Sequence, residues 1–418
     1  MLNWFDQRID HYNAQDARTY KQRYYSNSDY YIPGGPIFVY IGGEGAIGPS
    51  TISSGEIVEN AMSQGAMLYA LEHRYYGLSQ PFGDWSTPNM AFLSSQQALA
   101  DLANFIEIQN AVSAPNQTAP TWFSWGGSYP GCLSAWSRMK FPHLTSGSVA
   151  SSAPVLAKAD YFEYDQAVAA SANVYTPTCA DTVRAATKAV ESALDADPSL
   201  PVTFQCSNIA DPVGFLYVLA DAVAYSAQYT SDAPGPRYQL LPFMCDTLAD
   251  EALGDPVERY RVFLAQLFTK LSTNCVDFTT TIDALQNTTI DENSNQRQWY
   301  YQSCAEFGFF QTAPAVNSLR STRINLDFHL QQCLDAYGLP MVPNTAYTNA
   351  YYGGNQPAGT RVVFPNGSLD PWHVLSVLSS KSSSLVPILI NGTSHCTDLH
   401  ASSPTDSPAL QAARAQVC

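Results

Sequence analysis

The stretch from Thr121 to Gly131 constrains the fold of this chain more than any other. A short run of strand-forming residues, Trp122 to Trp125, leads through two glycines to Ser128. The residues after Gly131 carry apolar side chains at helical spacing as far as Lys140. A strand that turns into a helix through a glycine-flanked serine is typical of a nucleophile elbow. The glycines let strand and helix approach closely, and the tight turn leaves the serine hydroxyl exposed.

This elbow predicts an α/β-hydrolase fold with Ser128 as the nucleophile. Pro130 stands where the pattern G-x-S-x-G has its last glycine. A proline is tolerated there if it lies in the first helical turn, because its missing N–H would have no helical partner. The alternative interpretation is an ordinary glycine-rich turn between a strand and a helix.

Two further residues complete a catalytic triad in the order that this fold uses, serine, then acid, then histidine. Asp370 follows the predicted strand 360–364, and His395 follows the predicted strand 385–390. A serine hydroxyl is a poor nucleophile until a neutral imidazole accepts its proton, and a carboxylate must orient that imidazole. We therefore predict Asp370 and His395 as the partners of Ser128, with Asp398 and His400 as their main rivals.

A glycine-rich loop follows the predicted strand 36–41. In this fold such a loop supplies one backbone N–H of the oxyanion hole, and the residue after the nucleophile supplies the other. We expect these donors to be Tyr129 and one residue of the loop, Gly42, Gly43 or Glu44. The Glu44 side chain is a candidate for binding a substrate amino group, although it fits a solvated loop carboxylate equally well.

A helix-rich segment separates the elbow from the two late strands. We expect residues 1–156 and 346–418 to form the catalytic domain and 157–345 to form an inserted helical lid, with helices over 180–196, 213–225, 256–271 and 322–337. Six of the nine cysteines fall in this segment. Proximity in sequence suggests the disulfides Cys179–Cys206, Cys245–Cys275 and Cys304–Cys333, although sequence does not determine connectivity.

Composition excludes several classes of function. The formal charge of −16 argues against nucleic-acid binding and suits an acidic compartment. The cysteines form no C-x-x-C pair, and no histidine or carboxylate set has metal-ligand spacing, so we expect disulfides and neither a metal nor a cofactor. No apolar run is long enough to cross a membrane. The four N-x-[ST] sequons, at Asn116, Asn287, Asn366 and Asn391, suit a secreted or lysosomal protein, here as a mature chain without a signal peptide.

Several motifs give the chain a resemblance to the serine peptidase family that contains lysosomal Pro-X carboxypeptidase, dipeptidyl peptidase II and thymus-specific serine protease. These motifs are residues 5–12, 72–77, 126–129 with 141–143, and 366–372. Residues 151–154, 302–309 and 394–396 look closest to the thymus-specific branch. The family's fold is an α/β-hydrolase domain with a helical, disulfide-containing insertion, in agreement with the prediction from the residues themselves.

The resemblance implies cleavage of peptides or proteins after proline, at acidic pH. We expect a monomer or homodimer, although sequence does not determine the oligomeric state. The resemblance also implies that Trp372, Cys132 and Phe309 line the primary pocket, because apolar and aromatic walls suit a proline ring. Pro-X carboxypeptidases have histidine and arginine where this chain has Cys396 and His400. The alternatives are an esterase or lipase of the same fold, a dipeptidyl-type exopeptidase without proline preference, and a non-catalytic binding module.

Overall fold

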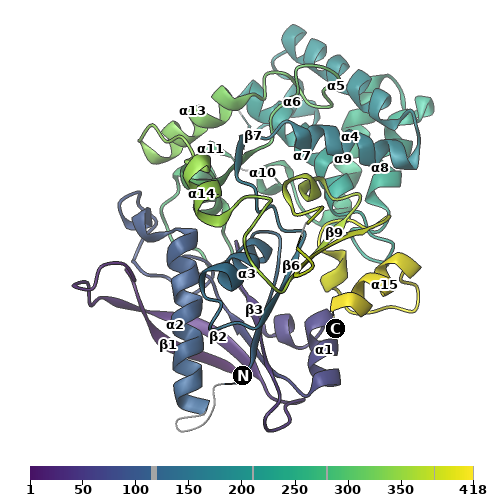
Figure 1. The fold of residues 1–418 in the computed structure, drawn as a ribbon. Coiled ribbons are helices and arrows are strands. Elements are labelled where there is room, and N and C mark those ends of the chain that lie inside the picture. The colour runs from purple at the N-terminus through teal and green to yellow at the C-terminus, as the bar shows by residue number, and fades with distance from the viewer. Residues whose placement is uncertain (114–119, 210, 279–280, 381, 418) are drawn as a thin grey trace.

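The computed structural model describes residues 1–113, 120–209, 211–278, 281–380 and 382–417. Its centre is an eight-stranded sheet in the order β1-β2-β4-β3-β5-β6-β9-β10 (Figure 1). Strand β2 pairs antiparallel with β1 and β4, and all the other neighbours pair in parallel. This is the predicted α/β-hydrolase fold. The strands are Leu2–Arg8 (β1), Thr19–Asn27 (β2), Ile37–Ile41 (β3), Met67–Leu71 (β4), Trp122–Gly127 (β5), Gly147–Ser151 (β6), Val362–Gly367 (β9) and Leu385–Ile390 (β10).

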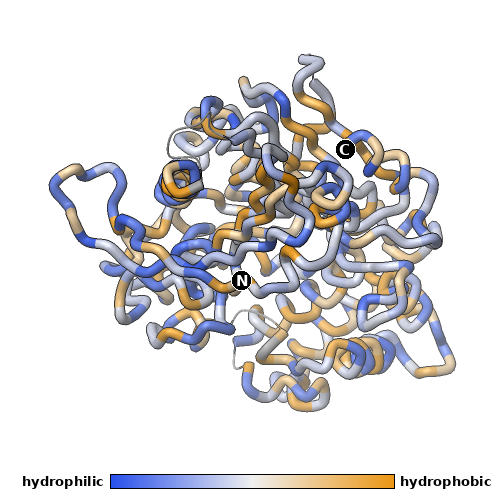
Figure 2. The backbone as a smooth tube through the Cα atoms, turned by 90° about the horizontal axis from the view of Figure 1, so that it is seen from below, coloured by the Kyte–Doolittle hydropathy of each residue, from blue (hydrophilic) through white to orange (hydrophobic). Residues whose placement is uncertain are grey.

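Side-chain alternation along the strands builds a core on each face of the sheet. In β3, Val39 packs with helices α2 (Ser95–Ser113) and α3 (Tyr129–Lys140), while Phe38 packs on the opposite face with helix α1 (Glu56–Gln64). Both faces are therefore covered, as a parallel sheet requires. Figure 2 shows the resulting pattern, with apolar segments running through the interior and polar segments forming the outer loops.

The helical segment between β6 and β9, here called the helical region, lies over the carboxyl ends of the parallel strands (Figure 1). Two short strands, Lys158–Asp160 (β7) and Gly308–Phe310 (β8), pair in parallel within it. The helix predicted from residue 322 begins at Leu326, because the side chain of Asn325 caps its first turn. The main helices are Glu163–Tyr175 (α4), Cys179–Ala196 (α5), Pro212–Gln228 (α7), Leu240–Ala249 (α8), Pro256–Leu271 (α9), Gln296–Gln302 (α12), Leu326–Tyr337 (α13) and Thr345–Tyr352 (α14).

Three disulfides tie this region together, but two of the three expected pairings are wrong. The bridges are Cys179–Cys245, Cys206–Cys275 and Cys304–Cys333. The first joins α5 to α8, whose packing brings together residues 66 positions apart in sequence. Pairing by sequence proximity fails here because helix packing, and not chain distance, decides which thiols meet.

Two of the motifs behind the family resemblance, residues 5–12 and 72–77, hold buried charged side chains that stabilise the fold. Arg74 is fully buried and donates from Nε to Asp101 Oδ2 at 2.7 Å, while His11 Nε2 lies 2.8 Å from Asp101 Oδ1. Glu72 is also fully buried and pairs with Arg23. The contacts of Asp101 fix helix α2 to the segments after β1 and β4, and the Glu72–Arg23 pair fixes β2 to the end of β4. Leaving any one of these buried charges unpaired would be costly.

Candidate active site

The elbow is formed by β5, Ser128 and α3. Ser128 has φ 63° and ψ −132°, a conformation that non-glycine residues rarely adopt. Its N–H donates to the carbonyl of Ser151 at 2.9 Å, which holds the strained turn against β6. A Cβ atom on Gly126 would lie 2.1 Å from the carbonyl oxygen of Pro130, so only glycine fits there. Pro130 lies in the first turn of α3, as predicted.

The structure places Asp370 and His395 in direct contact. His395 Nδ1 lies 2.8 Å from Asp370 Oδ2, and the backbone N–H of Trp372 donates to Asp370 Oδ1 at 3.0 Å. Asp370 is fully buried and His395 is 8% exposed. Because Nδ1 faces the carboxylate, Nε2 is the ring nitrogen left to accept a proton. Within the described residues Ser128 Oγ has no hydrogen-bond partner, and such catalytic bonds often form fully only with substrate bound.

The two rival residues lie in other surroundings. Asp398 Oδ1 accepts a hydrogen bond from Ser151 Oγ at 2.6 Å. Burial and neighbouring positive charge lower the pKa of His400, which faces a cavity beside the elbow. The geometry therefore favours Asp370 and His395 over Asp398 and His400 as the acid and the base.

The charge state of His395 is set by opposing effects. Burial alone would lower its pKa, but the Asp370 carboxylate and the Cys396 side chain outweigh burial and raise the pKa well above its usual range. In the free enzyme the imidazole therefore holds a proton at mildly acidic pH. A protonated imidazole cannot accept the proton of Ser128.

The backbone hydrogen bonds narrow the choice of candidate donors for the oxyanion hole. Tyr129 is the first residue of α3, where N–H groups have no partner within the helix. The N–H of Gly42 already donates to the carbonyl of Leu71 at 2.8 Å, so Gly42 is not available, contrary to our expectation. Gly43 lies against the elbow, since a Cβ there would be 2.2 Å from Pro130 Cγ. Tyr129 and Gly43 are thus the best candidates for this hole.

A buried hydrogen-bond network that the sequence analysis missed fixes the side chain of Tyr129. His73 Nδ1 lies 2.7 Å from the carbonyl of Arg74, so it carries the proton, and Nε2 accepts from the Tyr129 hydroxyl at 3.0 Å. Burial lowers the pKa of His73 to about 4, which keeps it neutral. Gln302 on α12 donates to the same hydroxyl at 2.9 Å. The helical region thereby contacts Tyr129, a candidate donor of the oxyanion hole.

An aromatic cluster surrounds Trp372, two residues after Asp370. The Trp372 ring lies 5.4 Å from Phe309, 5.6 Å from Tyr161 and 5.3 Å from Tyr164, measured between ring centroids. Phe309, in β8, takes φ 60°, a left-handed conformation. Cys132 is fully buried in α3, and burial followed by the nearby Glu44 carboxylate raises its pKa. Trp372 and Phe309 thus contact each other, as expected for two residues of one pocket. Cys132 lies near Glu44.

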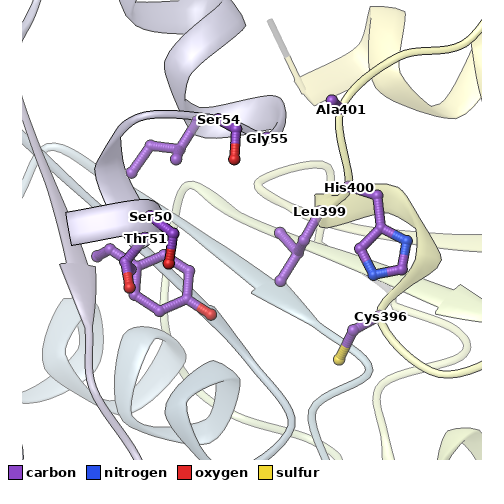
Figure 3. Close-up of a pocket in the computed structure, with 10 residues that line it drawn as sticks. Ser50, Thr51, Ser54, Gly55, Cys396, Leu399, His400 and Ala401 are labelled. Atoms are coloured by element: carbon purple, nitrogen blue, oxygen red, sulfur yellow. The ribbon is translucent and has the colours of Figure 1, made fainter. Parts of the chain in front are cut away.

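Two neighbouring cavities lie beside the elbow. One, of about 310 Å³, is lined by the oxyanion loop with Glu44, by Gly127 and by Pro130. The other, of about 420 Å³, has Cys396, Leu399 and His400 on one side and Ser50, Thr51, Ser54 and Gly55 on the other (Figure 3). Tyr40 and Thr51 line both cavities. Glu44 is half-buried, and burial raises its pKa while the charge of His395 opposes the rise.

Neither a metal centre nor a membrane span emerges from the described part of the chain. Its His, Cys, Asp and Glu side chains form no group of three or more that could hold a metal ion. None of its helices is both long and apolar enough to cross a membrane.

Comparison with known proteins identifies the family. Residues 7–417 match the model of the family described as serine carboxypeptidase S28. This chain belongs to the S28 family. It is 34% identical to mouse thymus-specific serine protease, over 99% of this chain and 85% of that protein. It is 28% identical to bovine lysosomal Pro-X carboxypeptidase, over 99% of this chain and 85% of that protein.

Solved structures give a looser likeness. Proline iminopeptidase from Mycobacterium smegmatis aligns with 14% identity and a TM-score of 0.43, over 99% of this chain and 96% of that one. Membership of the S28 family makes the chain a serine-type peptidase, and its fold is assigned from its own strand order.

The sequon asparagines of the S28 chain differ in their exposure to solvent. Asn366 lies at the end of β9 and is fully buried, so it cannot carry a glycan in the folded protein. Asn287 and Asn391 are exposed, and Asn116 lies outside the described residues.

We expect Ser128→Ala to abolish turnover by this S28 chain and Asp370→Asn to lower kcat by roughly four orders of magnitude, because the imidazole then loses its tautomer and its stabilising charge. Both kcat values should be measured on one peptide substrate, with circular dichroism to show that the fold persists. Asp398→Asn is the matched control and should retain most of the activity. Loss of turnover in Asp398→Asn with activity retained in Asp370→Asn would reverse the assignment of the acid.

A second expectation concerns stability. Glu56 accepts from Trp125 Nε1 at 2.9 Å and is buried; burial and then the Asp398 carboxylate raise its pKa from 4.5 to about 7. Its protonated form therefore favours the folded state below about pH 4.5, and this contribution is lost as pH rises through 7.

Relative to Glu56→Gln, the wild type should lose about 1–3 kcal/mol of unfolding free energy between pH 4.5 and 7.5. Urea denaturation at several pH values measures this difference. The exposed Glu292→Gln should parallel the wild type. A pH-independent difference between wild type and Glu56→Gln would contradict the expectation.

Proposed function

We propose that this S28 peptidase hydrolyses the peptide bond on the carboxyl side of proline through an acyl-enzyme on Ser128. The observation that carries the proposal is the aromatic cluster around Trp372, which lies directly beyond the triad acid. A proline ring presents apolar surface and no N–H, so an aromatic pocket suits it. The names of relatives such as lysosomal Pro-X carboxypeptidase support the same preference.

The proposed chemistry assigns one task to each residue. Ser128 Oγ attacks the scissile carbonyl while its proton passes to His395 Nε2. The N–H groups of Tyr129 and Gly43 stabilise the oxyanion of the tetrahedral intermediate. The imidazolium, stabilised by Asp370, then protonates the leaving amine. After the amine leaves, a water molecule takes its place and gives a proton to His395 Nε2 as it attacks the acyl-enzyme. The imidazolium then returns that proton to Ser128 Oγ, and the acid product is released.

We place the leaving side of the peptide in the cavity of about 420 Å³ next to Cys396. That cavity follows the His395 loop, which must deliver a proton to the leaving amine. Its lining residues, which include the hydroxyl-bearing Tyr40, Ser50, Thr51 and Ser54 and also His400, contain neither lysine nor arginine. A free carboxylate would find no permanent cation among these lining residues, so we propose that longer or blocked peptides are better substrates than those with one residue after proline.

Glu44 supports a second possibility, release of dipeptides from a free amino terminus. Its carboxylate lines the cavity that reaches Gly127, and Asn295 Nδ2 holds its backbone carbonyl at 2.6 Å. A carboxylate held next to the nucleophile is suited to bind an ammonium group. This alternative predicts that acetylation of the substrate amino group prevents cleavage.

The setting we propose is secreted or lysosomal. Three disulfides require an oxidising route of synthesis in most organisms, and the net charge of −16 is partly neutralised in an acidic compartment. Peptides or proteins are the expected partners.

Cleavage of a peptide set with proline or alanine at the position before the scissile bond tests the specificity. We expect kcat/KM to favour proline, and Trp372→Ala to reduce that preference by about tenfold, in the range of about 1–3 kcal/mol for losing pocket contacts. Trp4→Ala, at a tryptophan that is 41% exposed, is the control. Acetylated and amidated versions of each peptide locate the cut relative to the termini.

Ser128-dependent cleavage without preference for proline would overturn the specificity but keep the mechanism. Hydrolysis of acyl esters alone would favour the esterase alternative.

The pH dependence of turnover provides a separate test. Since the pKa of His395 is raised in the free enzyme, kcat/KM should fall as pH drops through that pKa. An acidic optimum, as the resemblance implies, then requires bound substrate to lower the pKa. We therefore expect the acid limb of kcat, which reports the enzyme–substrate complex, to lie at lower pH than that of kcat/KM. Coincident limbs would show that substrate does not change the pKa of the base.

A further inference from the structure

Gln228, the last residue of α7, makes three hydrogen bonds to groups at the active site. Its Oε1 accepts from Trp372 Nε1 at 3.0 Å and from the Tyr164 hydroxyl at 2.6 Å. Its backbone carbonyl accepts from the N–H of His395, also at 3.0 Å. The residue is 8% exposed, and no sequence motif marks it.

We propose that Gln228 is a positioning residue that determines specificity by holding Trp372 against the triad. This proposal rests on the proposed function, in which Trp372 forms a wall of the primary pocket. Gln228 acts through Trp372 and His395 and touches no reacting atom of its own.

The first step concerns the acid loop. The Trp372 backbone N–H binds Asp370 Oδ1, and the indole N–H of the same residue binds Gln228. Trp372 is therefore fixed at both ends, by the catalytic carboxylate and by the helical region. Rotation of the indole would break a buried hydrogen bond and would also reshape the pocket wall next to Phe309.

The second step concerns the histidine loop. Carbonyl groups in the last turn of a helix have no partner within the helix. In α7 this free carbonyl of Gln228 receives the His395 N–H, and the helix presents its negative end to the histidine. This arrangement favours the imidazolium that forms during catalysis. Substitutions of the side chain at 228 keep this backbone carbonyl, so they test the side-chain contacts with Trp372 and Tyr164 and not the contact with His395.

The third step is the choice of side chain. Two buried donors, an indole N–H and a phenol, converge on one oxygen, which needs two free lone pairs. A neutral amide supplies them, and the two donors define which end of the amide faces Trp372. Methionine has nearly the same shape but is a poor acceptor, so it would leave both donors without a partner.

The test measures the ratio of kcat/KM for peptides with proline and alanine before the scissile bond. We expect Gln228→Met to lower this ratio about tenfold through a raised KM for the proline peptide. Gln228→Glu, which keeps an acceptor oxygen, should restore much of the ratio and move the acid limb of kcat/KM to higher pH, because it adds a carboxylate near His395. Gln298→Met, at a buried glutamine that binds the carbonyl of Tyr75, is the control for lost packing.

A double-mutant cycle with Trp372→Phe identifies the route of the effect. If Gln228 acts through the indole N–H, Gln228→Met should change the ratio little further in the Trp372→Phe background. An unchanged ratio in Gln228→Met, or independent effects of the two substitutions, would overturn the proposal. A lower melting temperature with unchanged kinetic parameters would also overturn it, by showing a purely structural role.

Failure of the proposed function can be told apart from failure of the Gln228 proposal. It would appear in the wild type as absence of a proline preference. The same ratio would then be measured between the two best residues that the wild type accepts, and an unchanged value in Gln228→Met would still refute the role of Gln228.

Discussion

The close approach of β5 and α3 is the constraint on which the rest of the site depends. With no room for a side chain at Gly126, the chain reverses within one residue and Ser128 is forced to positive φ. The strain is supported from the side, because Ser151 on β6 accepts the Ser128 N–H and also binds Asp398. The nucleophile is thus exposed by a turn that could not persist without its neighbouring strand.

The helical region contacts the proposed catalytic loops as closely as the sheet does. Ser171 on α4 donates to the carbonyl of Leu369 at 3.0 Å, and Tyr161 donates to that of Pro371 at 2.6 Å. Gln228 and Gln302 reach the histidine loop and Tyr129 respectively. The acid loop therefore lies between β9 and these helices. Disulfides within the region stabilise not just a cover but one wall of the site.

The sequence alone was sufficient to predict those features that a local residue pattern determines. The elbow and the meeting of Asp370 with His395 could be predicted because strand ends on one edge of a parallel sheet converge. The disulfides and the contacts of Gln228 could not, since both depend on which helices pack together. Gly42 was indistinguishable from Gly43 by sequence, and only the bond to Leu71 separates them. The β1–β2 hairpin was missed because its residues are polar at the edge of the sheet.

Stability and catalysis make opposite demands on pH in this protein. Burial raises the pKa of Glu56 and of Glu306 to about 7 and that of Asp398 to about 6, so these groups favour the fold most at acidic pH. His73, with a pKa near 4, sets a lower limit, since its protonation would remove the acceptor for Tyr129. His395 must instead lose its proton to act. A fold suited to mildly acidic conditions thus needs its substrate to lower the pKa of the base, which desolvation by a bound peptide would do.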